Sequence, residues 1–578
     1  MTSDNHATAT QDGAAQDAAS QDTGDRRDQG ARAVDYDAIV VGAGFAGLYM
    51  LHSLRKLGFS VRVYEQGDGV GGTWYWNRYP GARCDSESVY YMFSDHMSEE
   101  ILAEWEWSER FAAQPEILRY LNFVTDKMDL RRDIRFGTKV TSAVYDAGRD
   151  VWDVTLGDGS TASARFLVTA VGCLSSTNTP EFPGIGTFTG KSYHTGAWPH
   201  EGVDFTGQRV AVIGTGATGV QAVPEIAKQA AHLWVFQRTP NYDVPNRNRP
   251  LEPDYAAEVK GSYKELWEKA RASGFGLPYQ VAERSAVDYS PEERERIFEA
   301  AWAKGGFYMG LETFSDYLVN RESNETVSEF LRSKIRELVN DPATGELLAP
   351  KDHPFFTKRP PLESGYYEAF NRDNVTLVDV RDAPIEEITP HGVRTGGQDY
   401  EVDSIVYATG FDAMTGTLYG MNITGRDGVR LEDKWADGPR TYLGLTTRGF
   451  PNLFIITGPQ SPSVLSNMPV VIEQNVEWIA SLIGYLREHG LDGAEAAADA
   501  EDQWVAHHNE VAAMTLLTGT DSWWMGANIP GKPRTLYPYV GGVGVFRDLC
   551  RDVADKGFQG LTLFRHEAEA TAPAGVSG

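Results

Sequence analysis

The distribution of apolar residues separates two polar ends from a long ordered middle. Residues 1–34 contain no Leu, Ile, Phe, Tyr or Trp. They therefore offer too little apolar surface to offset the entropy lost on ordering, and we expect a disordered tail. From residue 35 onward, short apolar runs alternate with helix-like stretches, which is typical of parallel strands connected by helices. The Ala- and Glu-rich end, residues 566–578, is predicted to be a second disordered tail.

The first ordered segment has the pattern of a strand, a tight turn, a helix and another strand. Strands are predicted over residues 36–41 and 60–65, and a helix over 48–57. The turn carries glycines at the spacing Gly-x-Gly-x-x-Gly: Gly42, Gly44 and Gly47. Such glycines let a pyrophosphate approach the backbone at a helix N-terminus. The second strand ends at Glu65, in the position of the acid that binds a ribose with a free 2′-hydroxyl. This site favours FAD or NAD.

The same pattern returns later in the chain with a different ending. Strands are predicted over residues 209–213 and 232–237. The position of the acid is taken by Gln237, and Arg238 and Thr239 follow. A guanidinium at this point suits a 2′-phosphate, so the second site favours NADP(H). The residues assigned to it around the turn are Gly214, Thr215, Gly216, Ala217, Thr218, Gly219 and Gln221.

Together these patterns predict an α/β protein with two Rossmann-like dinucleotide-binding domains and a helical insertion. Two further strand patterns, at 166–172 and 404–410, return the chain to a sheet edge near a cofactor, so the first domain is expected to be discontinuous. The expected divisions are 35–165 with 400–565 for the FAD-binding domain, 166–250 with 350–399 for the NADP-binding domain, and 251–349 for the insertion.

Charge, hydropathy and cysteine content narrow the function. With 53 Lys and Arg against 81 Asp and Glu among 578 residues, the net charge is −28, which argues against a nucleic-acid partner. The sequence shows neither an apolar run long enough for a membrane span nor a signal peptide, and we expect a cytoplasmic protein. Cys84, Cys173 and Cys550 form no close pair, which argues against a dithiol relay and a metal site. An electron-transferring reductase or an oxygenase remains.

Two longer motifs carry a family resemblance that covers about residues 35–565. Residues 188–199 resemble the fingerprint FxGxxxHxxxWP of Baeyer–Villiger monooxygenases, with all five fixed positions matched. Residues 71–85 resemble that family's motif GGxWxxxxYPGxxxD. The resemblance, nearest to the phenylacetone and steroid monooxygenase type, implies an FAD enzyme that uses NADPH and dioxygen. It would convert a ketone to an ester or lactone through a C4a-peroxyflavin.

The resemblance also implies roles for charged residues. The segment 357–360 is similar to the family motif whose arginine, here Arg359, stabilises the anionic oxygen species and contacts NADP. An arginine suits this task because it keeps its charge when partly buried and does not give up a proton. Asp85 would orient Arg359 as the second member of the catalytic pair, and Lys358 would face the NADP phosphate beside Arg238.

The remaining candidates follow from the same resemblance. His194 is assigned a hinge role. Trp523 is similar to a mobile-loop residue that contacts the NADP ribose. The ketone pocket is expected at Ser463, Val464 and Leu465. Further FAD contacts are expected at Thr73, Trp74, Tyr75, Trp76, Asp85, Tyr91, Val140 and Met468.

Two alternative functions stay open at this stage. An N-hydroxylating or sulfoxidising flavin monooxygenase would share both glycine turns. A redox-responsive module that binds FAD and NADP without oxygenating a substrate would also keep them, although it gives no reason for Lys358 and Arg359. The sequence does not distinguish cyclic, aromatic and polycyclic ketones, because loop packing around Ser463 and Trp523 sets the pocket shape.

Overall fold

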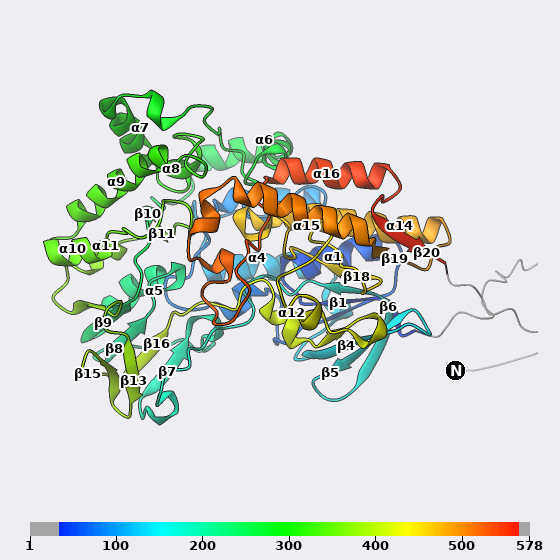
Figure 1. The fold of residues 1–578 in the computed structure, drawn as a ribbon, viewed down its shortest axis with the longest axis horizontal. Coiled ribbons are helices and arrows are strands. Elements are labelled where there is room, and N and C mark those ends of the chain that lie inside the picture. The colour runs from blue at the N-terminus through cyan, green and yellow to red at the C-terminus, as the bar shows by residue number, and fades with distance from the viewer. Residues whose placement is uncertain (1–33, 566–578) are drawn as a thin grey trace, which may run out of the picture. The chain divides into compact units, whose positions relative to one another are not determined.

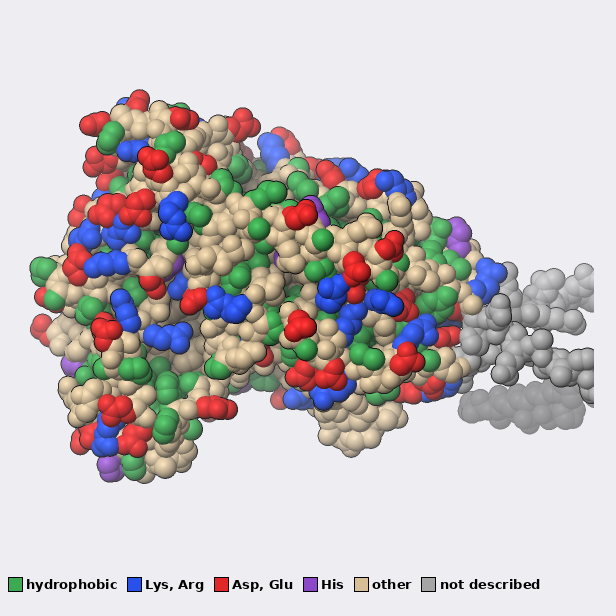
Figure 2. Space-filling view, in the orientation of Figure 1, with side chains coloured by type: hydrophobic (Ala, Val, Ile, Leu, Met, Phe, Trp, Pro, Cys, Tyr) green, Lys and Arg blue, Asp and Glu red, His purple; other side chains and the backbone are tan. Residues whose placement is uncertain are grey.

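The structure is a computed structural model that describes residues 34–565. The predicted tails lie outside the described residues, except for Val34. Within the described range, no helix combines the length and the apolar character that crossing a bilayer requires. On the face shown in Figure 2, Lys and Arg side chains are interspersed with Asp and Glu.

The larger sheet surrounds the first glycine turn. Its central strands β6, β1 and β2 run parallel, and the apolar residues of β1 are fully or almost fully buried. The strand order is β17-β4-β5-β6-β1-β2-β3, and β18 pairs with the last residues of β6. The bounds are β1 (Tyr36–Val41), β2 (Val61–Tyr64), β3 (Ile134–Arg135), β4 (Val140–Asp146), β5 (Val151–Leu156), β6 (Thr161–Thr169), β17 (Ile423–Thr424) and β18 (Leu453–Ile455).

Helices bury one face of this sheet. The apolar residues of α1 pack against α14, and α16 packs on α14 from outside (Figure 1). This burial provides the main core, because α14 is apolar around most of its circumference. The helices with the larger sheet are α1 (Phe45–Lys56), α2 (Thr73–Trp76), α3 (Glu99–Glu104), α4 (Gln114–Lys127), α12 (Gly416–Gly420), α13 (Leu431–Lys434), α14 (Met468–Glu488), α15 (Ala498–Ala513) and α16 (Val543–Asp555), beside the hairpin β19 (Gly493–Ala496) and β20 (Leu561–Phe564).

A smaller, fully parallel sheet surrounds the second glycine turn. Its order is β12-β9-β8-β16-β7. Helix α5 packs over it together with α11, while the small sheet β13-β14-β15 contributes to a second core cluster. The bounds are β7 (Lys191–His194), β8 (Arg209–Ile213), α5 (Ala217–Ala227), β9 (His232–Gln237), α11 (Tyr366–Ala369), β12 (Val375–Asp379), β13 (Ile385–Thr389), β14 (Gly392–Thr395), β15 (Gln398–Glu401) and β16 (Ser404–Tyr407).

The segment between β9 and β12 is mainly helical and appears in green in Figure 1. It leaves and returns through two short strands that pair in parallel, so its ends lie side by side. The bounds are β10 (Val244–Pro245), α6 (Pro253–Ala272), α7 (Pro291–Lys304), α8 (Tyr308–Leu311), α9 (Arg321–Leu338), α10 (Pro342–Leu348) and β11 (Leu362–Glu363).

Strand pairing corrects two of the expected domain boundaries. The boundary between 165 and 166 divides β6, which pairs with β1 up to Thr169. The boundary at 400 places β16 with the first domain, but β16 pairs with β7 and β8 in the smaller sheet. All four residues of β16 are buried, and a short buried strand fits either sheet equally well. The chain therefore returns to the larger sheet after Tyr407.

Candidate active site

The two glycine turns have matching geometry. Gly42 has φ +103° and Gly214 has φ +110°, values that favour glycine because L side chains are strained there. A Cβ at Gly42 would lie 2.6 Å from the carbonyl oxygen of Ala170, and one at Gly214 would lie 2.5 Å from that of Ala408. Each turn thus packs against the residue that follows a neighbouring parallel strand.

The acid predicted at the first turn is in place. Glu65 is 4% exposed. Its carboxylate accepts hydrogen bonds from the backbone N–H groups of Ala43 (2.8 Å) and Gly67 (2.7 Å). Burial raises the pKa of Glu65, while these backbone bonds act in the opposite direction. Because the side chain also lines a cavity, its remaining acceptor positions are available to ribose hydroxyls, and the residues fit the adenosine half of FAD.

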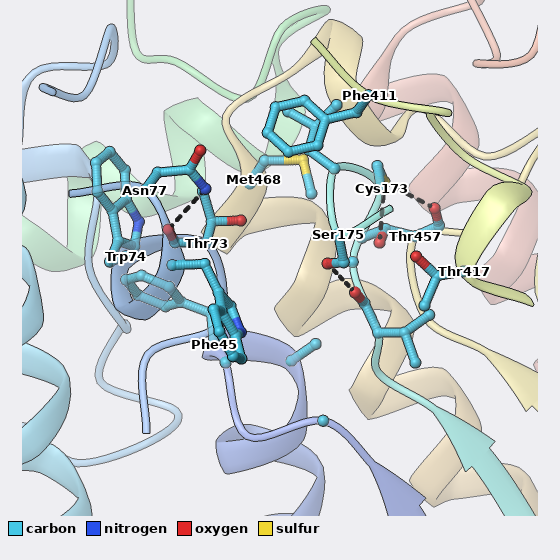
Figure 3. Close-up of a pocket in the computed structure, with 18 of the residues that line it drawn as sticks. Phe45, Thr73, Trp74, Asn77, Cys173, Ser175, Phe411, Thr417, Thr457 and Met468 are labelled. Atoms are coloured by element: carbon cyan, nitrogen blue, oxygen red, sulfur yellow. Dashed lines mark hydrogen bonds between the residues drawn. The ribbon is translucent and has the colours of Figure 1, made fainter. Parts of the chain in front are cut away.

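A large cavity runs from the first turn towards α5. Figure 3 shows Phe45, Thr73 and Trp74 on one side and Cys173, Thr417 and Thr457 on the other, with Met468 and Phe411 along the upper wall. The predicted residues that line it are Gly42, Gly44, Glu65, Thr73, Trp74, Trp76, Asp85, Tyr91, Val140, Ala217, Thr218, Gln221, Arg359, Val464, Met468 and Trp523. The predicted residues outside its lining are Gly47, Tyr75, His194, Gly214, Thr215, Gly216, Gly219, Arg238, Thr239, Lys358, Ser463 and Leu465.

Arg359 and Asp85 form an ion pair at the cavity wall. Arg359 donates from Nε to Asp85 Oδ2 (2.6 Å) and from Nη2 to Asp85 Oδ1 (2.9 Å). Its Nη1 donates to the carbonyl oxygen of Val464 at 2.8 Å, and its Cζ lies 5.1 Å from the ring centre of Phe307. Burial alone would lower the pKa of Arg359, but Asp85 reverses the shift, so the pKa is raised and the guanidinium stays charged.

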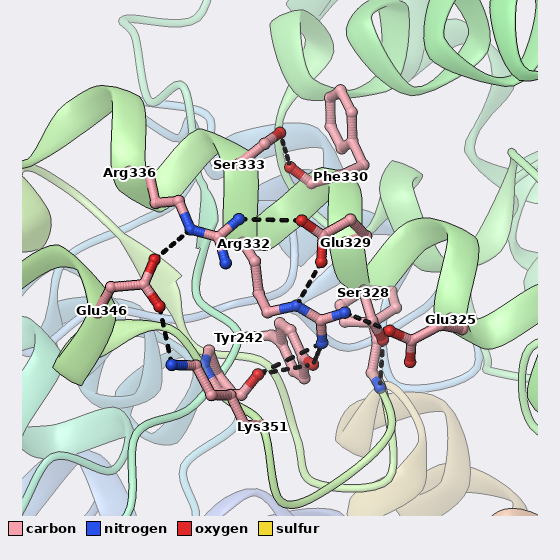
Figure 4. A network of polar contacts seen from close by, with 12 residues as sticks. Tyr242, Glu325, Ser328, Glu329, Phe330, Arg332, Ser333, Arg336, Glu346 and Lys351 are labelled. Atoms are coloured by element: carbon pink, nitrogen blue, oxygen red, sulfur yellow. Dashed lines mark hydrogen bonds and ion pairs between the residues drawn. The ribbon is translucent and has the colours of Figure 1, made fainter. Parts of the chain in front are cut away.

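Helix α9 fixes the backbone that leads to Arg359. The buried side chain of Asn324 donates to the carbonyl oxygen of Phe355 and accepts from its N–H, both at 2.9 Å. Arg332 donates from Nη1 to the Tyr242 hydroxyl (2.9 Å) and to the carbonyl oxygen of Pro350 (3.4 Å). Figure 4 shows Arg332 within a wider network of ion pairs that joins α9 to α10. The insertion therefore anchors this segment at two points.

Two cations gather at the second turn. Burial lowers the pKa of Lys358, and the charge of Arg238 lowers it further. Arg238 is exposed and has no ion-pair partner within 4 Å among residues 34–565. Gln237, at the position of the acid, donates instead to the carbonyl oxygen of Leu347 at 2.8 Å. The charges of Asp352 and Asp521 act on Lys358 in the opposite direction to that of Arg238. Two cations close together still favour a bound anion, and this pair fits the 2′-phosphate of NADP(H).

The long motif also joins the two nucleotide turns. Tyr79 donates to Gln221 Oε1 at 2.8 Å, and Gln221 Nε2 donates to the carbonyl oxygen of Arg83 at 3.1 Å. A Cβ at Gly81, where φ is +83°, would lie 2.2 Å from the carbonyl oxygen of Gln221. Glycine is thus required for α5 to pack against this motif, a contact that spacing alone did not indicate.

Three predicted residues lie behind the cavity wall. The ring of Tyr75 packs against Gly67, and its hydroxyl accepts from the N–H of Asp68 (3.0 Å), so it supports the loop before α2. Ser463 has φ +42° and is fully buried, with its Oγ 2.9 Å from Cys173 Sγ. Leu465 packs in an apolar cluster. None of these three residues lines the cavity, and their roles toward FAD and the ketone stay predictions.

Three other residues of the site belong to no motif of the sequence. Phe411 and Cys173 line the cavity, and Phe307 contacts Arg359 from within the insertion. The usable signal for Phe307 was the preceding pair Gly305 and Gly306, both at positive φ, which marks a sharp turn.

Fold and site together define a flavoprotein oxidoreductase with separate sites for two dinucleotides. Residues 36–250 match the family model described as flavin-binding monooxygenase-like. The chain is 45% identical to a Baeyer–Villiger monooxygenase of Pseudooceanicola batsensis, over 91% of this chain and 96% of the relative. It is 43% identical to a phenazine N-monooxygenase of Lysobacter antibioticus, over 91% and 97%.

A solved structure is similar to this chain in both sequence and fold. An oxidised steroid monooxygenase bound to NADP is 49% identical and superposes with a TM-score of 0.87, over 92% of this chain and all of that one. The chain belongs to the Baeyer–Villiger monooxygenases.

Proposed function

We propose that this chain uses FAD, NADPH and dioxygen to insert an oxygen atom beside the carbonyl of an apolar ketone, with Arg359 as its catalytic cation. The observation that carries the residue assignment is the paired contact of Arg359 with Asp85 at the cavity wall. Glu65 at the first turn supports FAD there, and Arg238 with Lys358 supports NADPH at the second. A bound FAD would supply, once reduced by NADPH, the centre at which dioxygen is activated.

Arg359 keeps hydrogen-bonding capacity for the reaction. A guanidinium has five N–H groups, and three of those of Arg359 are used by Asp85 and Val464. The two that remain are available to an oxygen atom that gains negative charge in the cavity. Since Asp85 fixes the plane of the guanidinium, these donors are oriented before substrate binds, which is the arrangement that stabilises a transition state most.

The cavity lining favours a neutral, apolar ketone. Leu174, Val464, Phe411, Met468 and Trp523 present carbon and sulfur surface. Such a lining excludes water from the carbonyl and packs best against apolar substituents. Phe411 and Trp523 come from different segments, so the shape of this part of the cavity depends on how their loops pack.

His194 supports the hinge assignment, which remains a proposal. Its Nε2 lies 3.3 Å from the carbonyl oxygen of Asn178 and 3.4 Å from Thr409 Oγ1. Asn178 and Thr409 belong to the two chain connections between the sheets. A residue that contacts both connections is well placed to couple their movements.

The substitution Arg359→Ala tests the assignment. We expect the protein to retain FAD and to oxidise NADPH, while ester or lactone formation falls roughly 100- to 1000-fold, as is usual when an electrostatic stabiliser is removed. Product is measured by gas chromatography on a panel of cyclic, aromatic and polycyclic ketones, with hydrogen peroxide measured in parallel. Ester formation near the parent rate would remove Arg359 from the mechanism.

Oxygenation at nitrogen is the second candidate, because a relative at 43% identity is named a phenazine N-monooxygenase. The same apolar cavity would accept a flat heteroaromatic ring. Supplying phenazine and ketones side by side and identifying the products by mass spectrometry separates the two. An N-oxide without any ester would favour the second candidate.

A further inference from the structure

An ion pair made by a buried lysine fastens the loop that carries Trp523. Lys532 Nζ lies 2.5 Å from Asp412 Oδ1 and 2.6 Å from the carbonyl oxygen of Ala413. The Lys532 side chain is 7% exposed, and its ammonium lies 4.8 Å from the ring centre of Tyr537. Burial lowers the pKa of Lys532, and Asp412 opposes that shift. Residues 520–534, which contain Trp523, are called the Trp523 loop below.

The Trp523 loop has two further polar attachments. Asn528 Nδ2 donates to the carbonyl oxygen of Phe411 at 2.8 Å. At the start of the loop, Thr520 Oγ1 donates to Thr357 Oγ1 at 2.9 Å, and Thr357 immediately precedes Lys358 and Arg359. The loop is therefore held at one end by the segment of the catalytic arginine and at the other by residues 411–413. Trp523 lies between these attachments and lines the cavity.

Residues 411–413 belong to the chain connection that leaves the smaller sheet after β16. The N–H of Asp412 donates to the carbonyl oxygen of Ser176, and the N–H of Met414 donates to that of Cys173, both at 2.9 Å. Ser176 and Cys173 follow β6 and belong to the other connection between the sheets. Asp412 therefore stands where both connections meet.

We propose that Lys532 is a positioning residue: its ion pair with Asp412 couples the position of Trp523 to the two connections between the nucleotide-binding sheets. A change in those connections would then move the Trp523 loop with them, and closing of the loop over NADPH would fix the connections. This inference deepens the proposed function, because Trp523 forms part of the wall of the same cavity.

Asp412 and Lys532 are not equally suitable for substitution. The Asp412 side chain is 30% exposed and the Lys532 side chain 7%, so Asp412 can be hydrated when its partner is removed, whereas Lys532 cannot. An uncompensated buried charge destabilises the fold itself. Lys532→Met keeps the apolar stem on Tyr537 and removes only the charge, and it is the cleaner variant.

Chymotrypsin cleavage after Trp523 and Trp524 reports on the loop without requiring turnover. We expect Lys532→Met to be cleaved there about tenfold faster than the parent, which corresponds to about 1.4 kcal/mol of lost attachment. NADP⁺ should slow this cleavage more in the parent than in Lys532→Met. Lys532→Arg should restore resistance to chymotrypsin. Arg534→Gln is the matched control, because Arg534 pairs with Asp521 at the surface of the same loop, and its cleavage should equal that of the parent.

Turnover supplies the second measurement. Lys532→Met should raise KM for NADPH and the share of NADPH that yields hydrogen peroxide, with kcat changed less. Cleavage of Lys532→Met at the parent rate would overturn the proposal, as would equal acceleration at sites outside the loop. Because proteolysis needs no ketone, it decides the proposal even if no ketone is oxidised, so its failure is distinguishable from failure of the proposed function.

Discussion

Asp85 accepts two hydrogen bonds from Arg359, although 274 positions separate them in the chain. Asp85 closes the long motif that begins beside the first glycine turn, and Arg359 follows the helical insertion. The paired contact fixes both the distance and the plane of the guanidinium, since two parallel N–H···O bonds leave it little freedom to rotate. The cavity wall therefore depends on correct packing of both parts of the chain.

Asp85→Asn should lower product formation while leaving FAD bound. The amide keeps one acceptor but loses the negative charge and the second acceptor, so the guanidinium can rotate. Small displacements of a positioned group cost up to about 100-fold, and we expect kcat to fall roughly 10- to 100-fold. The flavin absorbance of the purified protein gives FAD content, and product chromatography gives kcat.

Asp85→Glu provides the comparison for this substitution, because it keeps the charge and both acceptors on a longer stem. Its kcat should lie between those of the parent and Asp85→Asn. If Asp85→Asn and the parent form product equally fast, orientation of Arg359 by Asp85 is not required.

The nucleotide turns were predictable from local sequence pattern, but the strands that pair beside them were not. The strands β1, β8 and β9 have the bounds that their apolar runs predict, and β1 and β8 end directly at the glycine turns. The sheet to which β16 belongs was not predictable, since burial on both faces is common to the two sheets.

The pairing of Asp85 with Arg359 followed only from family resemblance. No local periodicity connects residues so far apart, and either residue alone fits an ordinary surface position. The position of Ser463 could not be predicted for a different reason: its segment is adjacent to the cavity, but its side chain contacts Cys173 in a backbone conformation with positive φ. The direction of a side chain in an irregular loop depends on tertiary packing.

Two glycines of the second turn should respond differently to alanine. A Cβ at Gly216 would meet no heavy atom within 4 Å, and φ is −82° there, so Gly216→Ala should fold normally. It should nevertheless raise KM for NADPH, because the methyl group occupies space that a pyrophosphate requires. At Gly214, φ of +110° and the contact with Ala408 should make alanine destabilising by about 1–3 kcal/mol.

Thermal unfolding of both variants, together with NADPH titrations, checks this contrast. Equal melting temperatures for Gly214→Ala and the parent would contradict the strain argument. An unchanged KM in Gly216→Ala would contradict pyrophosphate binding at this turn.

Affinity for NADPH should decrease as the pH becomes alkaline, and the decrease should begin at a pH lower than the ordinary pKa of lysine. Burial and the charge of Arg238 lower the pKa of Lys358, so its positive charge is present at neutral pH and is lost as pH rises through the lowered value. Arg238→Ala removes one cause of the shift and should move the alkaline limb to higher pH, while raising KM at neutral pH by roughly 10- to 100-fold through loss of a charged hydrogen bond. KM for NADPH and for NADH, measured across pH, tests both effects; a parallel loss for NADH would exclude a 2′-phosphate contact.

His508 should make the protein less stable in mild acid. Its side chain is buried, its Nε2 lies 2.6 Å from the carbonyl oxygen of Leu536, and burial lowers its pKa to about 4. Between that value and the ordinary 6.5, the unfolded chain binds a proton that the folded chain does not. Stability therefore falls as pH decreases through this range, by about 2 kcal/mol between pH 7 and pH 5 from this group alone.

His508→Gln isolates this contribution, because its amide still donates to Leu536 but does not titrate. Near pH 7, where His508 is neutral, the difference in unfolding free energy between parent and variant reports packing alone. At pH 5 the variant should have gained about 2 kcal/mol relative to the parent. Urea unfolding at both pH values measures the two differences. If they are equal, His508 does not bind its proton preferentially in the unfolded chain, and the acid sensitivity must arise from other groups.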